Sequence, residues 1–125
     1  MAGLQPSTPA PTEIHLHRAS ATLEVAFDNG ARYVLPAEYL RVLSPSAEVR
    51  GHGVGQGVLQ VGKRAVKLVN IEAVGHYAVK LTFDDGHDSG LYSWDYLHEL
   101  GRDQARLWQG YLDELAAAGA SRDPQ

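Results

Sequence analysis

Strict alternation of apolar and polar side chains near the start of the chain is the feature that most constrains its fold. Residues 14–17 read Ile-His-Leu-His, and residues 23–27 read Leu-Glu-Val-Ala-Phe. Apolar residues two positions apart lie on one face of a β-strand. The Asp-Asn-Gly run at residues 28–30 tolerates positive φ and favours a tight hairpin turn, after which Tyr-Val-Leu at residues 33–35 continues the pattern. We therefore predict a three-stranded meander over Glu13–Leu35.

Turn and capping signals divide the rest of the chain into short elements. Pro36 can open a helix that ends before Pro45, since the residue before a proline disfavours helix. Ser93 can cap a second helix, and Gly101 can end it. The elements expected after the meander are a helix over 37–43, a glycine-rich loop over 46–62 with a short strand near 58–61, a hairpin of 65–74 and 77–83, a strand at 91–92, and helices over 94–100 and 103–118.

Together these elements predict an α+β fold. Antiparallel hairpins or a meander would pack with a short helix after the third strand and with one or two C-terminal helices. A chain of 125 residues suits one domain, which we place at residues 13–118. Residues 1–12, rich in Pro, Ser, Thr and Ala, are expected to form a flexible tail, and residues 119–125 are expected to fray.

Composition excludes several classes of function. The formal net charge of −4 and the pI of 5.8 argue against a nucleic-acid partner. No apolar run is long enough to cross a membrane, and the first residues lack the pattern of a signal peptide, so a cytoplasmic protein without a membrane partner is expected. The chain has no cysteine, which excludes disulfides, thiolate zinc sites and cysteine nucleophiles.

Charge is distributed unevenly along the chain. Residues 40–70 carry five Lys or Arg and one Glu, whereas residues 72–99 carry six Asp or Glu and one Lys. One interpretation is a bipolar surface that steers a protein partner, with Arg41, Arg50, Lys63 and Arg64 on its basic side. The alternative is an ordinary solvated surface.

Catalytic motifs are incomplete. Residues 57–63 match the spacing of a phosphate-binding loop, but Arg64 follows where that motif needs Ser or Thr, and a strand pattern follows where a helix is needed. No serine lies in a nucleophile-elbow pattern. We therefore expect the chain not to be an enzyme.

A metal site is the main alternative. Asp84, Asp85, His87 and Asp88 crowd one predicted turn, and His52 could join them after folding. Imidazole and carboxylate ligands suit iron, zinc or manganese. The same Asp-Asp-Gly-His run is also good turn chemistry without any ligand, so both interpretations stay open.

Four runs of residues carry a family resemblance. They are PAEYLRVLSPSAEVRGH at residues 36–52, VGK at 61–63, GHYAV at 75–79 and FDDGHDSGLYSWDYL at 83–97. Over about residues 13–101 the chain resembles the gamma-butyrobetaine hydroxylase-like N-terminal domain family. The resemblance implies a small α+β module that precedes an iron- and 2-oxoglutarate-dependent catalytic domain in hydroxylases, or accompanies ATPases that carry iron–sulfur clusters. The H-x-D motif of that catalytic domain is missing from this sequence, so hydroxylation is not transferred to it.

The resemblance also implies a zinc site, built in the hydroxylases from three cysteines and one histidine. The matching positions here hold Ser44, Ser46, Val49 and His87. Serine and valine cannot replace thiolates at a tetrahedral zinc site, so no cofactor is expected. We expect His87 to serve the turn structurally, for example by a hydrogen bond to the Ser44–Ser46 loop.

The function expected from these observations is that of a non-catalytic accessory or protein-interaction module. The resemblance connects its partner to iron-dependent oxygenase or iron–sulfur assembly systems. The alternative is a small protein that binds iron or zinc through His87 and the neighbouring carboxylates.

Overall fold

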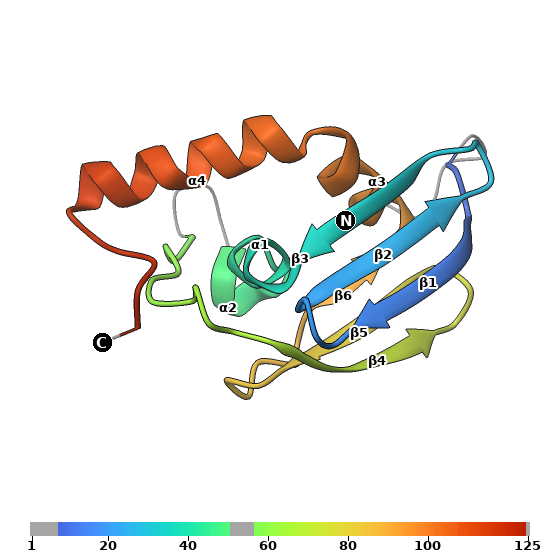
Figure 1. The fold of residues 1–125 in the computed structure, drawn as a ribbon, viewed down its shortest axis with the longest axis horizontal. Coiled ribbons are helices and arrows are strands. Elements are labelled where there is room, and N and C mark those ends of the chain that lie inside the picture. Colours follow the sequence, from blue (N-terminus) through green and yellow to red (C-terminus); the bar gives the residue numbers. More distant parts are fainter. Residues whose placement is uncertain (1–7, 51–56, 125) are drawn as a thin grey trace.

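The computed structural model describes residues 8–50 and 57–124, and shows two small sheets with helices at one end (Figure 1). Each sheet has three antiparallel strands, in the orders β1-β2-β3 and β4-β5-β6. The predicted α+β class is confirmed. Within the described residues, every helix is too short or too polar to cross a membrane.

The predicted meander is confirmed as the first sheet. It comprises β1 (Pro11–His17), β2 (Thr22–Phe27) and β3 (Arg32–Pro36). Gly30 has φ 88° in the β2–β3 turn, and the backbone N–H of Phe27 donates to the carbonyl of Ala31 over 2.8 Å. Strand β1 begins at Pro11, so the last residues assigned to the flexible tail belong to the sheet, and residues 1–7 lie outside the described part.

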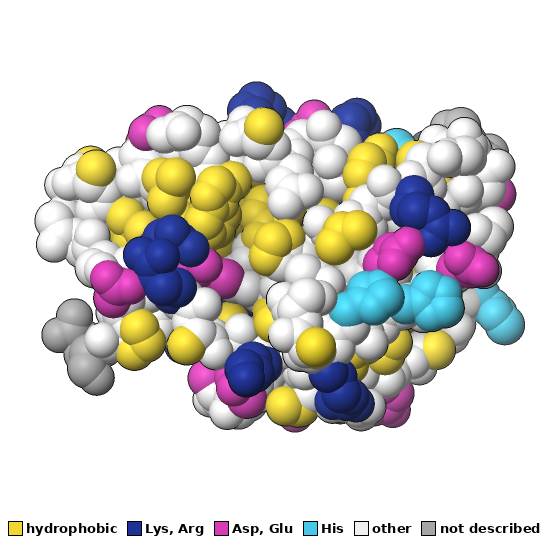
Figure 2. All heavy atoms as spheres, in the orientation of Figure 1, with side chains coloured by type: hydrophobic (Ala, Val, Ile, Leu, Met, Phe, Trp, Pro, Cys, Tyr) yellow, Lys and Arg dark blue, Asp and Glu magenta, His cyan; other side chains and the backbone are white. Residues whose placement is uncertain are grey.

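Alternation places the two faces of this sheet as expected. Leu23, Val25 and Phe27 are buried in the core, whereas His15 and His17 are exposed. Figure 2 shows histidine side chains beside acidic and basic ones on the face in view. Arg32 forms ion pairs with Glu13 and Glu24 on this surface, and the Nε2 atoms of His15 and His17 lie 3.7 and 2.7 Å from the carboxylates of the same two glutamates.

The second sheet supplies the other half of the core. It comprises β4 (Leu68–Val74), β5 (Ala78–Phe83) and β6 (Leu91–Ser93). Leu81, Phe83 and Tyr92 pack in one cluster with the buried face of the first sheet. Strand β6 pairs only with β5 among the described strands and is therefore an edge strand.

The segment between the sheets differs from its prediction. Helix α1 (Ala37–Val42) begins directly after Pro36, as expected, but a short helix α2 (Ala47–Arg50) lies where a loop was predicted. The strand expected near 58–61 is wrong, because residues 57–61 form no ladder. The hydroxyls of Tyr39 and Tyr92 fix α1 by donating to the carbonyls of Leu100 and Leu40.

Two helices complete the described fold, α3 (Trp94–Arg102) and α4 (Gln104–Ala118). The predicted cap is confirmed, since the N–H of Tyr96 donates to Ser93 Oγ over 3.1 Å. Gly101 does not end α3. A Cβ built there would lie 2.2 Å from the ring of Tyr33, so the glycine instead permits close approach of the helix to β3.

Residues 119–124 pack against the fold, which corrects the expectation that they fray. Gly119 ends α4 with φ 64°, and the N–H of Gly62 then donates to the carbonyl of Ser121 over 2.9 Å. Arg122 forms a bidentate ion pair with Glu38 over 2.7 and 2.8 Å. Its guanidinium lies 5.1 Å from the ring centroid of Trp108. Figure 2 shows the hydrophobic hollow beside α4 that charged side chains partly cover.

Candidate functional site

The turn between β5 and β6 carries the histidine that the sequence singled out. The N–H of Phe83 donates to the carbonyl of His87 over 2.9 Å, and Gly86 adopts φ 90° within the turn. His87 is 8% exposed, so the turn directs its ring inward rather than toward solvent.

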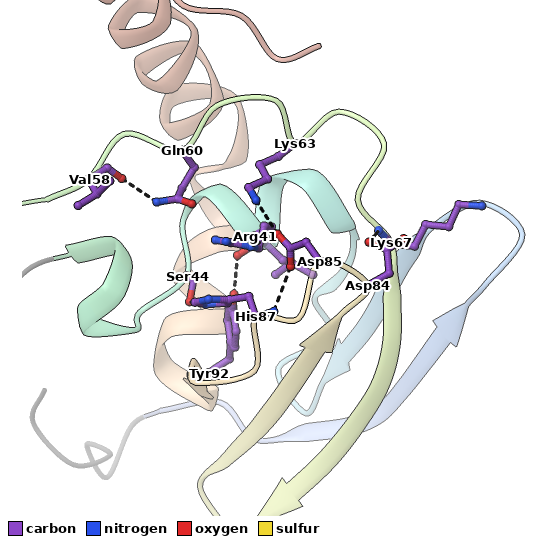
Figure 3. Close-up of polar contacts among 11 residues, drawn as sticks. Arg41, Ser44, Val58, Gln60, Lys63, Lys67, Asp84, Asp85, His87 and Tyr92 are labelled. Carbon is purple, nitrogen blue, oxygen red and sulfur yellow. Dashed lines mark hydrogen bonds and ion pairs between the residues drawn. The ribbon is translucent and has the colours of Figure 1, made fainter. Parts of the chain in front are cut away.

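His87 faces the loop after α1 (Figure 3). Its Nε2 lies 2.9 Å from Ser44 Oγ, and this hydroxyl also accepts a hydrogen bond from the N–H of Ser46 over 3.2 Å. A second contact joins Ser46 Oγ to Ser89 Oγ over 2.7 Å. The predicted hydrogen bond between His87 and the Ser44–Ser46 loop is confirmed. We call Ser44, Ser46, His87 and Ser89 the serine–histidine cluster.

Close packing supports this cluster. Ser44 is fully buried. A Cβ added at Gly90 would lie 2.5 Å from Ser44 Oγ and 3.2 Å from the ring of Tyr92. The absence of a side chain at Gly90 therefore lets the β5–β6 turn approach the Ser44–Ser46 loop closely.

Asp85 organises the neighbouring charges (Figure 3). Its carboxylate accepts hydrogen bonds from Arg41 Nε over 2.8 Å, Lys63 Nζ over 2.6 Å and the backbone N–H of His87 over 3.1 Å. Partial burial acts to raise the pKa of Asp85, but these bonds from Lys63, His87 and Arg41 outweigh it and lower the pKa from 3.8 to about 2. The carboxylate is therefore held ionised as the anchor of two cations.

Two members of the predicted basic docking surface, Arg41 and Lys63, are used within the fold. Arg41 is buried and cannot contact a partner directly. Lys63 pairs with the same carboxylate as Arg41, that of Asp85. Arg64 is half exposed and pairs with Asp123. The side chain of Arg50 lies outside the described residues. Much of the uneven charge along the chain is thus used within the fold.

The predicted metal ligands diverge where the structure describes them. Asp84 Oδ1 accepts the N–H of Lys67 over 3.0 Å, Asp85 binds cations, and Asp88 is exposed. His52 lies outside the described residues. In residues 8–50 and 57–124 no three His, Cys, Asp or Glu side chains form a group that could hold a metal.

The zinc that the family resemblance implies does not fit the residues present. Ser44 and Ser46 offer neutral hydroxyls, and these hydroxyls are engaged with His87 and Ser89. Val49 is buried and offers no ligand. A structural zinc site needs thiolate or imidazole donors in a tetrahedral set, so a hydrogen-bonded cluster stands in its place.

A groove of about 750 Å³ lies beside the serine–histidine cluster and was missed from the sequence. Its lining includes the edge strand β6, the loop before α2 and one face of α3; the residues are Pro45, Ser46, Ala47, Tyr77, Ala78, Ser89, Leu91, Ser93, Asp95, Tyr96 and Glu99. Tyr77 and Leu91 are each 45% exposed. The sequence carries no signal for it, because Leu91 and Tyr92 are both apolar and only the structure shows that Tyr92 is buried and Leu91 is not.

Two carboxylates lie on the α3 wall of this groove. Asp95 and Glu99 are one helical turn apart, and neither forms an ion pair with a residue that the structure describes. From the described residues, Asp95 Oδ1 accepts one long hydrogen bond, 3.3 Å, donated by Thr8 Oγ1. Lysine and arginine are absent from the lining of the groove as far as the structure describes it.

The chain forms a compact α+β domain of two small antiparallel sheets with a helix after the third strand. The β5–β6 turn of this domain is joined to the Ser44–Ser46 loop through His87. Residues 14–98 match the family described as gamma-butyrobetaine hydroxylase-like, N-terminal, and the chain belongs to this family. The resemblance inferred from the sequence is thereby confirmed. No curated protein matches the chain.

Solved structures extend this likeness over nearly the whole chain. A protein solved by NMR in solution is 56% identical to this chain. The match covers 95% of this chain and 94% of that protein, with a TM-score of 0.83. A second NMR structure is 52% identical, with 99% and 92% coverage and a TM-score of 0.82. A crystal structure of a protein of unknown function of the DUF971 family, from Acidithiobacillus ferrooxidans ATCC 23270, is 37% identical, with 78% and 98% coverage and a TM-score of 0.63.

Proposed function

We propose that this domain is a non-catalytic protein-interaction module that uses the groove beside β6. The observation that carries the proposal is the exposure of Tyr77 and Leu91 at that groove. Large apolar side chains around a concave surface are typical of binding sites, because covering them removes apolar area from water.

The serine–histidine cluster supports this assignment by shaping the groove. Ser46 and Ser89 both line it, and their hydroxyls are 2.7 Å apart, so the two walls are tied together. A preformed wall lowers the entropy that binding must overcome. Ser44 and His87 are residue types common in catalytic sites, but here they contact each other in the interior.

The partner belongs to iron-dependent oxygenase or iron–sulfur assembly systems. This part of the proposal rests on membership of the gamma-butyrobetaine hydroxylase-like N-terminal family. The module would act as an accessory surface beside such a partner, without a cofactor of its own.

Site-specific crosslinking in cells tests the proposal. A photoreactive amino acid replaces Leu91 in the groove or, as the matched control, Val34 on the outer face of the first sheet, which is also exposed. The proposal expects a discrete protein adduct from position 91 and none from position 34, with the captured protein identified by mass spectrometry. Equal adducts from both positions, or none from position 91, would refute the groove as the interaction surface.

A further inference from the structure

We infer that the groove beside β6 binds an extended peptide segment in which lysine or arginine alternates with apolar residues. This inference rests on the proposed function and names the chemistry of the partner. Three features of the groove carry the inference: carboxylates that form no ion pair with a described residue, the edge of β6 that pairs with no described strand, and exposed apolar side chains.

The first feature is electrostatic. Asp95 and Glu99 are four residues apart on α3, a spacing that puts two like charges next to each other on a helix. Neither carboxylate makes an ion pair with a described residue, and the described residues that line the groove include no lysine or arginine. A bound lysine or arginine would relieve this repulsion, since complementary charge favours the matching partner and disfavours an acidic one.

The second feature is the backbone of β6. The N–H of Trp94 donates to the carbonyl of Tyr77 over 3.0 Å, and Ser93 is the register partner of Ala78. Hydrogen-bonded and non-hydrogen-bonded pairs alternate in an antiparallel ladder. The backbone groups of Leu91 therefore point away from β5, toward the edge that β6 presents. An extended peptide can add to such an edge as a further strand.

The third feature is the apolar surface. Tyr77 and Leu91 flank the groove on the side of the second sheet, and Asp95 and Glu99 line it from α3. Side chains of an added strand point alternately to opposite faces. A segment with alternating basic and apolar residues can therefore meet both kinds of surface at once, whereas a uniformly basic or uniformly apolar segment meets only one.

Titration of the isotope-labelled full chain with a short peptide of alternating lysine and valine tests this inference by NMR. We expect shift changes at Tyr77, Leu91, Asp95 and Glu99, and slower amide exchange at Leu91 in the complex. A peptide with glutamate in place of lysine is the charge control and is expected not to bind. Shifts centred elsewhere, or equal binding of both peptides, would overturn the inference.

A pair of variants isolates the charges of the groove. Asp95→Asn with Glu99→Gln should weaken binding of the lysine peptide about tenfold, the effect of losing one favourable charge interaction. The matched control is Glu72→Gln with Asp113→Asn, which changes net charge equally at exposed positions outside the groove and should leave affinity within about twofold. If both pairs of substitutions weakened binding of the lysine peptide equally, the effect would come from net charge alone and the proposed site would be refuted.

The two proposals fail in different ways. If position 91 crosslinks a protein in cells but the lysine peptide leaves the groove unshifted, the interaction module stands and the partner chemistry is wrong. If shifts at the groove depend on the concentration of the chain without any peptide, a second copy occupies it and the inference is also wrong. If neither peptide shifts the groove and position 91 crosslinks nothing, both proposals fall.

Discussion

Replacing Asp85 with asparagine should destabilise the fold more than any other single change of charge at the β5–β6 turn. Asp85 accepts from both Arg41 and Lys63, and only 23% of its side chain is exposed. Asp85→Asn leaves the guanidinium of Arg41 buried without its counter-charge, while an amide oxygen still accepts one bond. Breaking a buried ion pair costs about 3–5 kcal/mol, and partial exposure of this pair brings the expected loss to about 2–3 kcal/mol at neutral pH.

The loss should depend on pH in a defined direction. An aspartate carboxyl ordinarily has a pKa of 3.8, and the contacts of Asp85 in the fold lower its pKa to about 2. A lowered pKa stabilises the folded state fully above the unfolded value, and this contribution disappears as pH falls from about 4 through about 2. A shift of this size corresponds to about 2 kcal/mol, and solvent screening of the partly exposed carboxylate reduces it to about 1–2 kcal/mol.

Urea unfolding followed by tryptophan fluorescence at pH 6 and pH 2.5 measures both effects. The difference in unfolding free energy between wild type and Asp85→Asn should be about 1 kcal/mol smaller at the lower pH. Most of the stability that comes from the lowered pKa of Asp85 is lost at that pH. Asp84→Asn is the matched control: Asp84 is exposed and accepts one backbone N–H, so its loss should stay below about 1 kcal/mol. A gap that stays constant between the two pH values would refute the assignment of Asp85 as the ionised anchor.

Three further changes test other contacts. Ser44→Ala removes the buried partner of His87 and should lower the unfolding free energy by about 1–3 kcal/mol, measured by urea unfolding. Gly101→Ala should cost about 1–3 kcal/mol despite its better helix propensity, because the new Cβ overlaps the ring of Tyr33; a more stable variant would show that the ring moves aside freely. Iron(II) or zinc(II) should leave the melting temperature unchanged, and a rise that His87→Ala abolishes would instead establish the metal-binding alternative.

Local signals in the sequence were enough to predict most elements. Alternation over residues 14–35 and the Asp-Asn-Gly turn specify the first sheet because period and turn chemistry act between near neighbours. Ser93 as the cap of α3 is likewise a contact across three residues. The hydrogen bond between His87 and the serine loop was the one long-range contact that the sequence predicted, through the family resemblance.

Contacts between distant segments could not be predicted in the same way. Residues 119–124 have the composition of a fraying end, yet Arg122 finds Glu38 and Trp108 on other helices. Arg41 and Lys63 look like a basic surface, but the fold brings Asp85 to both of them. The sum of charge along a segment therefore says little about exposed charge when opposite charges in other segments lie within reach.

The serine–histidine cluster and the groove are parts of one unit rather than neighbours by chance. Ser44 is hydrogen-bonded to His87, and Ser46 is hydrogen-bonded to Ser89. These two hydrogen bonds join the loop before α2 to the β5–β6 turn. Each such bond adds only about 0.5–1.5 kcal/mol, far less than a structural zinc supplies. The cluster therefore cannot replace a metal as a source of folding energy, and stability must come from the core of the two sheets. Its hydrogen bonds can still fix the distance between two walls of the groove, which requires direction more than strength.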